Sequence, residues 1–205
     1  VVDLVTDAFK NDVNNRQVNW DDLYQTNYRN LDANNQRRSK YIVENRLTDS
    51  KQLTLSSVLN KELSARLKLD AGAEFLVYRG RNYKAIDDLL GGDYFLDIDQ
   101  FAERDFGDPI LMQNDLDNPT RQVKNGDTYG YDYIANVNTG DLWAVASYIT
   151  NKLDYYFGAN YEMNQFWRTG NMRNGRFPND SKGDSKKELF NTYGLKGGTT
   201  WKITG

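Results

Sequence analysis

The chain contains no cysteine and no histidine. Without cysteine it has no disulfide framework and no thiolate metal site. Without histidine it lacks the commonest general base and the commonest metal ligand. Proline is rare, with 3 in 205 residues, and no apolar run reaches the roughly 18 residues that a membrane-spanning helix needs. These absences exclude zinc–thiolate proteins, histidine-dependent hydrolases and a span formed by a helix.

Charge and aromatic content narrow the classes that remain. The 26 basic and 29 acidic side chains give a net charge of −3. Nucleic-acid-binding domains are strongly basic, so we expect no nucleic-acid partner. Aromatic residues make up 13% of a chain whose mean hydropathy is −0.80. A polar chain rich in tyrosine and tryptophan is typical of alternating membrane-barrel strands with aromatic girdles. A secreted sugar-binding domain can have the same composition.

The segment Leu153–Met163 separates two chemistries by parity. The odd positions are apolar or aromatic: Leu153, Tyr155, Phe157, Ala159, Tyr161 and Met163. Most even positions are polar or small, which indicates a strand with one apolar and one polar face. Its length matches the roughly 9–11 residues that a tilted strand needs to cross a bilayer. We predict that the odd set faces lipid and that Asp154, Asn160 and Glu162 face the lumen of a barrel.

The rest of the chain divides into strands and connections within one domain. We expect an irregular loop over 1–36 with a short helix near Asp3–Lys10, strands over 37–83, a long external loop over 84–126 with a short helix at Ala85–Leu90, strands over 127–168, an external loop over 169–188 and a strand over 189–205. Short turns at Lys61–Ala65 and Thr150–Lys152 alternate with the long connections, as in outer-membrane barrels. The predicted fold class is all-β, with about five to six antiparallel up-and-down strands forming part of a transmembrane β-barrel. Both long loops should leave from one rim.

The strand that begins near Tyr129 is less regular. Its polar positions place Asp132 and Asn136 on the lumen side, and a bulge at Thr139-Gly140 would then shift the parity. Trp143 and Trp201 lie near the predicted short turns, where an aromatic girdle would place them.

Five stretches resemble TonB-dependent outer-membrane receptors of the Bacteroidota kind. They are WDDLYQTNYRN (Trp20–Asn30), YFLDIDQFAERDF (Tyr94–Phe106), GDTYGYDY (Gly126–Tyr133), FWRTGNMRNGRFPNDSKGDS (Phe166–Ser185) and NTYGLKGGTTWKITG (Asn191–Gly205). The resemblance falls in the front part of the barrel, after the plug. It implies a receptor in the bacterial cell outer membrane, with a barrel of about 22 strands around a plug, that imports a scarce nutrient by energy-coupled transport.

The same resemblance implies partners. They are the plug and other strands of the same receptor, outer-membrane lipid, a surface lipoprotein, and the TonB system through an N-terminal part that this sequence does not include. The chain starts at Val1 and closes on Thr204-Gly205 after a strand-like run. We therefore expect an internal piece of a longer receptor.

The acidic residues of the predicted long loop could form a catalytic or metal site, or could serve the structure of the loop alone. The acids between Asp93 and Asp108 are compatible with a hydrolase that uses paired carboxylates. They have no matched basic or histidine partner nearby that would tune their pKa values, so a solvated loop with internal caps is favoured. The NDLDN stretch at Asn114–Asn118 lacks the spacing and the distal glutamate of a calcium loop. We expect no catalytic residue, no cofactor and no metal.

Ligand contact is the remaining candidate role. The candidates are Trp167, Arg168, Arg173, Arg176, Asp97, Asp99 and Glu103. The arginines suit an anionic or sugar ligand at the barrel mouth. In the alternative, Trp167 belongs to an aromatic belt and the charges hold the loops to their neighbours.

Two other classes of protein are also compatible with the sequence. One is a soluble secreted β-domain that binds carbohydrate through tyrosine and tryptophan. The other is an extracellular β-rich hydrolase that uses the loop acids. The exposure of the odd-parity face discriminates between them and the receptor, because a soluble domain buries such a face in its core.

Overall fold

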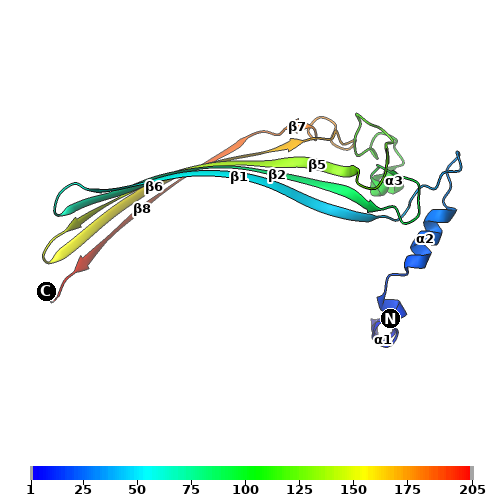
Figure 1. Cartoon of the computed structure of the whole chain (residues 1–205), viewed down its shortest axis with the longest axis horizontal. Coiled ribbons are helices and arrows are strands. Elements are labelled where there is room, and N and C mark those ends of the chain that lie inside the picture. The colour runs from blue at the N-terminus through cyan, green and yellow to red at the C-terminus, as the bar shows by residue number, and fades with distance from the viewer. Residues whose placement is uncertain (1, 204–205) are drawn as a thin grey trace. The chain divides into compact units, whose positions relative to one another are not determined.

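A computed structural model describes residues 2–203 of the chain (Figure 1). These residues fold as two compact units. The first comprises residues 2–47, 83–132 and 172–178, and the second comprises 48–82, 133–171 and 179–203. The long strands contribute residues to both units.

A 6-stranded sheet dominates the described chain. Its strands are β1 (Val43–Glu62), β2 (Leu67–Asp88), β5 (Thr128–Ile149), β6 (Leu153–Gly170), β7 (Gly183–Asp184) and β8 (Glu188–Trp201). The order is β1-β2-β5-β6, and β6 pairs with both β7 and β8 on its other side. The sheet is antiparallel, as predicted, and within residues 2–203 it does not close on itself. Strands β1 and β8 therefore each leave one edge unpaired in the described part of the chain.

Two short turns lie at one end of this sheet (Figure 1). The turn between β5 and β6 spans Thr150–Lys152, as predicted, and the turn between β1 and β2 spans residues 63–66. The backbone N–H of Ile149 donates to the carbonyl oxygen of Arg66 at 2.8 Å, which joins the two turns. Lys202, just after β8, pairs with Asp154 at 2.8 Å beside them.

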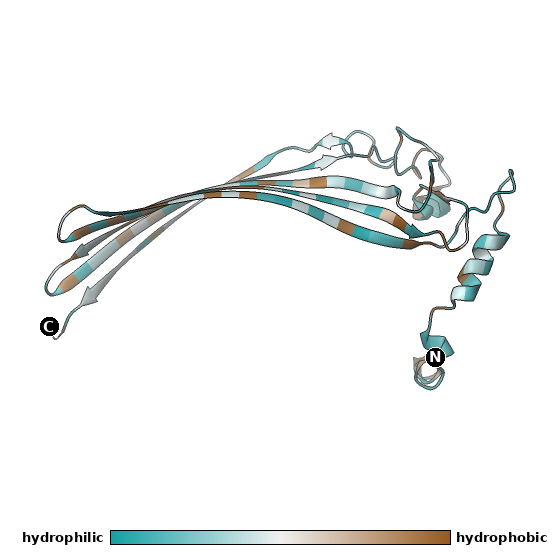
Figure 2. Cartoon of the chain, viewed as in Figure 1, coloured by the Kyte–Doolittle hydropathy of each residue, from teal (hydrophilic) through white to brown (hydrophobic). Residues whose placement is uncertain are grey.

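The register of β5, β6 and β8 defines the two faces of the sheet. Leu142 lies opposite Tyr161, and Tyr161 lies opposite Tyr193, so the three side chains share one face. We call this the apolar face. Its apolar members are Leu53, Leu55, Leu59, Ala71, Ala73, Phe75, Val77, Leu142, Ala144, Ala146, Tyr148, Leu153, Tyr155, Phe157, Ala159, Tyr161, Met163, Tyr193, Leu195 and Trp201. The opposite, polar face carries Asp154, Asn160 and Glu162, as predicted. Figure 2 shows the apolar residues interspersed with polar ones along the strands.

The apolar face is open to its surroundings. Phe157 is 58% exposed, Tyr161 45% and Leu195 71%. No second layer of the described chain covers these side chains, and the buried apolar residues all lie in the first unit. Along β6 the apolar stretch ends after Met163, because the next pair on that face is Asn138 with Gln165.

The predicted parity of β5 is wrong near its start. The β5–β6 ladder runs without a break from Tyr133 to Ile149, so there is no bulge at Thr139-Gly140. Asn136 consequently lies opposite Trp167, on the face that continues the apolar one, and not with Asn160. Asp132 has the same parity as Asn136 on the same continuous strand. Beyond the apolar stretch polar side chains occur on both faces of the sheet, so polarity does not identify the face of Asp132 or Asn136.

Trp143 was also misplaced. It lies opposite Asn160 on the polar face of β5. A Cβ added at Gly72 would meet the indole of Trp143, so this ring packs over a glycine and does not belong to a girdle. Trp201 pairs with Leu153 beside the short turns and is on the apolar face, as predicted.

The first unit contains the helices and the buried core. The helices are α1 (Val2–Asn11), the 3₁₀ helix η1 (Asn14–Arg16), α2 (Trp20–Arg29) and α3 (Gln100–Phe106). Two further strands, β3 (Phe95–Leu96) and β4 (Gln122–Val123), pair within the long loop. The core consists of Ile86, Leu89, Phe95, Val123 and Tyr129, with Ile42 packed against it.

Several local predictions in this unit need correction. The helix near Asp3–Lys10 is confirmed by α1, but 1–36 also contains α2, whose start is capped by Asn19 through a hydrogen bond from Asp22 N. The predicted helix at Ala85–Leu90 is wrong, because β2 continues to Asp88 and places Ile86 in the core. Tertiary burial here overrides local propensity.

Helix α2 is fixed by a buried side chain. Asn27 is fully buried, and its Nδ2 donates to the carbonyl oxygens of Tyr41, Leu89 and Leu90. Its Oδ1 accepts hydrogen bonds from the backbone N–H groups of Lys40 and Tyr41. A fully satisfied amide of this kind specifies the position of a segment that has few apolar contacts. Within residues 2–203, no helix is long and apolar enough to cross a membrane.

Candidate functional site

The two long loops meet within the first unit. The backbone N–H of Leu116 donates to the carbonyl oxygen of Arg173 at 2.7 Å, and the N–H of Gly175 donates to that of Gln113 at 2.8 Å. An ion pair of 2.7 Å between Arg173 and Asp117 adds a side-chain link. The prediction that both loops leave from one end of the strands is therefore confirmed.

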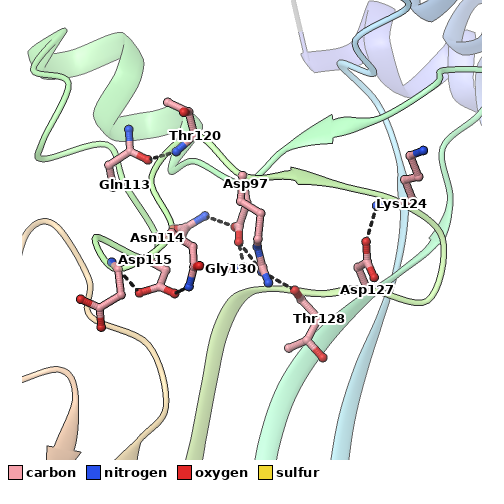
Figure 3. Close-up of polar contacts among 12 residues, drawn as sticks. Asp97, Gln113, Asn114, Asp115, Thr120, Lys124, Asp127, Thr128 and Gly130 are labelled. Carbon is pink, nitrogen blue, oxygen red and sulfur yellow. Dashed lines mark hydrogen bonds and ion pairs between the residues drawn. The ribbon is translucent and has the colours of Figure 1, made fainter.

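Asp97 is the most deeply buried of the candidate ligand-contact residues, with 2% of its surface exposed. Its Oδ1 accepts hydrogen bonds of 2.9 Å from the side-chain amide of Asn114 and from the backbone N–H of Gly130 (Figure 3). Its Oδ2 pairs with Arg121 at 2.7 Å, and the same guanidinium nitrogen donates to the carbonyl oxygen of Thr128. Gly130 has φ of +73°, a conformation that favours glycine. Asp97 thus ties the long loop to the start of β5.

Asp99 and Arg176 come together, although they lie far apart in the sequence. Asp99 caps α3 by accepting hydrogen bonds from backbone N–H groups of its first turn. Its Oδ2 lies 3.7 Å from Arg176 Nη1. Glu103, on the same helix, lies 3.5 Å from the guanidinium of Arg38. Ion pairs of this length at a surface contribute little stability, so these charges can exchange partners with a ligand.

The stretch Asn114–Asn118 holds the loop by internal contacts. Asp115 accepts hydrogen bonds from the backbone N–H of Asp117, from the side chain of Asn118 and from the backbone N–H of Arg173. In residues 2–203, no group of three or more acidic, histidine or cysteine side chains is arranged to hold a metal ion.

A pocket of about 300 Å³ opens in the first unit. It is lined among others by Lys40, Glu44, Lys84, Phe95, Asp99, Phe101, Asn114, Tyr129 and Tyr131. Asp99 is the one predicted ligand-contact residue in this lining. The mixture of aromatic rings with charged groups is suited to a polar ligand that offers both hydrogen-bonding groups and a flat face.

Glu44 is the electrostatic centre of this pocket. Tyr129 donates its hydroxyl hydrogen to Glu44 Oε2, Lys84 Nζ lies 3.1 Å from the same oxygen, and Arg46 Nε lies 2.7 Å from Oε1. Burial opposes the charge on this carboxyl, but the hydrogen bonds from its three partners outweigh that effect and hold the pKa of Glu44 at about 2. Burial and the bond to Glu44 both raise the pKa of Tyr129. Lys84 Nζ also lies 5.7 Å from the ring centre of Tyr129 and 5.5 Å from that of Tyr131.

The sequence analysis did not identify this group of Glu44, Arg46, Lys84, Tyr129 and Tyr131, which we call the Glu44 cluster. The signal for two of its members was the GDTYGYDY stretch, in which Tyr129 and Tyr131 share one parity. Glu44 and Lys84 gave no local signal, because they are distant in the sequence and meet only when β1 and β2 pair.

Trp167 and Arg168 lie in the second unit and have separate roles. The ring of Trp167 lies between Arg79, at 4.9 Å, and Lys187, at 4.6 Å. Arg168 Nη1 donates to the carbonyl oxygen of Ser181 at 2.8 Å and Nη2 to that of Asp180 at 2.6 Å. Arg168 therefore holds the second loop, as the alternative interpretation predicted for the loop charges.

The arrangement supports binding more directly than covalent chemistry. The acids of the long loop serve as caps and ion-pair partners, and the pocket combines charge with aromatic surface. No protein-family model, no curated protein and no solved structure matches the chain.

Proposed function

We propose that this chain forms part of the barrel wall of an outer-membrane TonB-dependent receptor for energy-coupled nutrient uptake. The apolar face would lie against lipid and the polar face would line the lumen. The observation that supports this proposal best is the exposed apolar face of the second unit. Phe157, Tyr161 and Leu195 have no covering layer within residues 2–203.

The height of the apolar face supports the same proposal. Along β6 the apolar stretch Leu153–Met163 covers about 35 Å at ~3.4 Å per residue. A tilt of about 45° reduces this to about 25 Å, the height of the apolar band in outer-membrane barrels. Strand β6 then continues to Gly170 with a mixture of polar and aromatic side chains, among them Gln165, Trp167 and Arg168, as expected where a strand passes through the membrane interface.

The open edges favour a wall that other strands complete. β1 and β8 each leave an unpaired edge in residues 2–203. Such edges are templates for further strand pairing. The remaining strands, the plug and the contact with the TonB system would come from the rest of the receptor, and a surface lipoprotein is a further candidate partner.

Ligand recognition would belong to the first unit. Its pocket combines Glu44, Lys84, Tyr129 and Tyr131 where the loops are held together. Binding residues commonly lie on loops that a rigid scaffold positions. The receptor would bind its nutrient there without covalent chemistry.

These 205 residues contain no cysteine, so a single cysteine introduced among them can be labelled without competition from this part of the protein, which permits a direct test of the membrane face. Single cysteines replace Phe157 and Tyr161 on the apolar face and Asn160 and Glu162 on the polar face, and each receives a nitroxide label in the full-length protein in bilayers. We expect oxygen, which dissolves in lipid, to relax the first pair, and a water-soluble nickel chelate to relax the second pair.

Two results would contradict the proposal. If the labels at Phe157 and Tyr161 are inaccessible to both reagents, the face is buried in a protein core, and the soluble β-domain is favoured. If all four labels respond to the nickel chelate alike, neither face meets lipid.

A further inference from the structure

A cationic patch lies on the apolar side of the sheet, just beyond the end of the apolar stretch. Trp167 is four residues beyond Met163 on β6 and has the same parity. Its ring is flanked by the guanidinium of Arg79 at 4.9 Å and the ammonium of Lys187 at 4.6 Å. Arg79 is anchored, because its Nη1 donates to Asn138 Oδ1 and to the carbonyl oxygens of Val137 and Tyr78.

A third cation is placed beside Arg79 by the register of β1 and β2. Hydrogen bonds between Thr48 and Asn82 and between Asn60 and Asp70 fix this register. In it, Lys51 lies opposite Arg79 on the same face. We define the cationic patch as Lys51, Arg79, Trp167 and Lys187.

Two acidic groups lie near this patch on the same side of the sheet, Asp184 and Asp49. In the register that Thr48–Asn82 and Asn60–Asp70 define, Asp49 on β1 lies opposite Arg81 on β2. Asp184 on β7 accepts a hydrogen bond of 2.6 Å from Thr169. Glu188 lies opposite Phe166, on the polar face, and pairs with Lys186 at 2.9 Å. On the side of the sheet that bears the apolar face, the four cations Lys51, Arg79, Arg81 and Lys187 therefore outnumber the two acids Asp49 and Asp184, which leaves an excess of positive charge.

An apolar hollow lies next to the patch on the same face. It has a volume of about 470 Å³ and is lined by Leu55, Ala73, Phe75, Gly140, Tyr161 and Met163, among others. The small residues Ala73 and Gly140 leave the space that the larger side chains surround. A Cβ added at Gly140 would meet no atom within 4 Å, so the hollow is open above this residue.

The patch and the hollow are aligned along two strands. Arg79 follows Phe75 by four residues on β2, and Trp167 follows Met163 by four residues on β6. Four residues of extended chain cover about 13 Å. An amphiphile whose anionic head contacts the patch can therefore lay an apolar chain into the hollow.

We propose that this surface binds one phosphorylated, acylated lipid of the bilayer. Its phosphate contacts Arg79 and Lys187, with Lys51 adding to the local charge, and its acyl chain fills the hollow above Gly140. Arginine and lysine are suited to phosphate oxygens, and tryptophan is suited to the interface between headgroups and acyl chains. This inference depends on the proposed function, because it requires the apolar face to meet lipid.

The test measures lipid binding to the full-length protein in detergent by native mass spectrometry. Three probes separate the two parts of the site: dioleoyl phosphatidic acid has phosphate and acyl chains, dioleoylglycerol has only the chains, and inorganic phosphate has only the phosphate. We expect one phosphatidic acid to bind at least tenfold more tightly than either of the other probes.

Variants then locate the site. The double variant Arg79→Gln with Lys187→Gln should weaken phosphatidic acid binding at least tenfold, and Gly140→Leu should weaken it through occupation of the hollow. Lys196→Gln is the matched control, because Lys196 lies opposite Gly158 on the polar face of the same sheet. It should leave binding unchanged.

Other results would overturn the lipid site. Equal binding of phosphatidic acid and either dioleoylglycerol or inorganic phosphate would do so. So would an equal loss of binding for Lys196→Gln and the double variant, or unchanged binding by both the double variant and Gly140→Leu. The nitroxide experiment separates this failure from that of the proposed function. If oxygen still relaxes the label at Phe157 while the variants leave lipid binding unchanged, the proposed membrane face is supported and the proposed lipid site is ruled out.

Discussion

The indole ring of Trp143 covers the backbone of Gly72 on the neighbouring strand. A side chain at position 72 would occupy the space of that ring, so the glycine permits a large aromatic residue to lie flat on the polar face. The indole ring fills the space above a residue that has no side chain of its own.

Replacing Gly72 by alanine should therefore displace the ring of Trp143. Overpacking of this kind costs about 1–3 kcal/mol. Thermal unfolding in detergent measures the stability, and the tryptophan emission reports the displacement. Gly140→Ala is the control, since a Cβ there meets open space. Equal effects of the two substitutions would show that the contact with Trp143 is not what requires glycine at position 72.

Asp97→Ala should loosen the long loop without abolishing the strands. The substitution leaves Arg121 without its carboxylate partner and Gly130 N–H without an acceptor. Removing one member of a buried ion pair costs about 3–5 kcal/mol; because Arg121 is one-third exposed, we expect the lower end of this range. Hydrogen exchange over residues 97–130 should rise severalfold. Asp105→Ala, which removes a surface ion pair with Arg104, should leave exchange unchanged; an equal rise would contradict the bracing role of Asp97.

The Glu44 cluster should make the first unit sensitive to acid. The pKa of Glu44 falls from 4.5 in the unfolded chain to about 2 in the folded protein. Because the folded pKa is the lower one, the stabilisation is fully present above about pH 4.5 and disappears as the pH falls towards 2. The contribution is on the order of 3 kcal/mol.

Glu44→Gln tests this dependence. Urea unfolding, followed by hydrogen exchange around Tyr129, should show a large loss of stability for the variant at pH 7 and a much smaller difference from the unchanged protein at pH 3. Glu74→Gln on β2 provides the comparison at a position outside the cluster. A difference for Glu44→Gln that does not shrink on acidification would rule out the carboxylate as its cause.

Charge on the two faces of β6 should be tolerated unequally. Phe157→Lys places an ammonium on the apolar face, which costs about 2–4 kcal/mol near the middle of a bilayer. Asn160→Lys places the same group on the polar face. We expect the first variant to reduce assembly into membranes, measured as the heat-modifiable folded fraction on gels, and the second to assemble normally. The opposite order would contradict the face assignment.

Much of the sheet could be predicted from sequence, because alternation is a local property. Leu153–Met163 and the turn at Thr150–Lys152 followed from parity and spacing alone. The face of Asn136 could not, since polar residues occur on both faces once a strand leaves the apolar region, and only the unbroken ladder to Trp167 assigns it.

The first unit was harder to predict, because its contacts join distant residues. Asn27 reaches Leu89 and Leu90, and Glu44 reaches Tyr129, each across a long stretch of sequence. The acid Asp97 was identified as a member of the loop, but its role depends on Gly130 and Arg121, which have no recognisable spacing from it. The helix expected at Ala85–Leu90 failed for the same reason.

The long loop between β2 and β5, which Asp97 ties to Arg121 and Gly130, also affects how fast the sheet can assemble. Strands β1 with β2, and β5 with β6, close over short turns, whereas pairing β2 with β5 must close a loop of about 40 residues at an entropic cost of about 3 kcal/mol. Local structure in that loop, namely β3 with β4 and Asp97 with Arg121, shortens the free chain to be closed. The two hairpins are then expected to form first, and their docking to wait for the loop. A carboxylate that stabilises the folded loop would in this way also set the slowest step of folding.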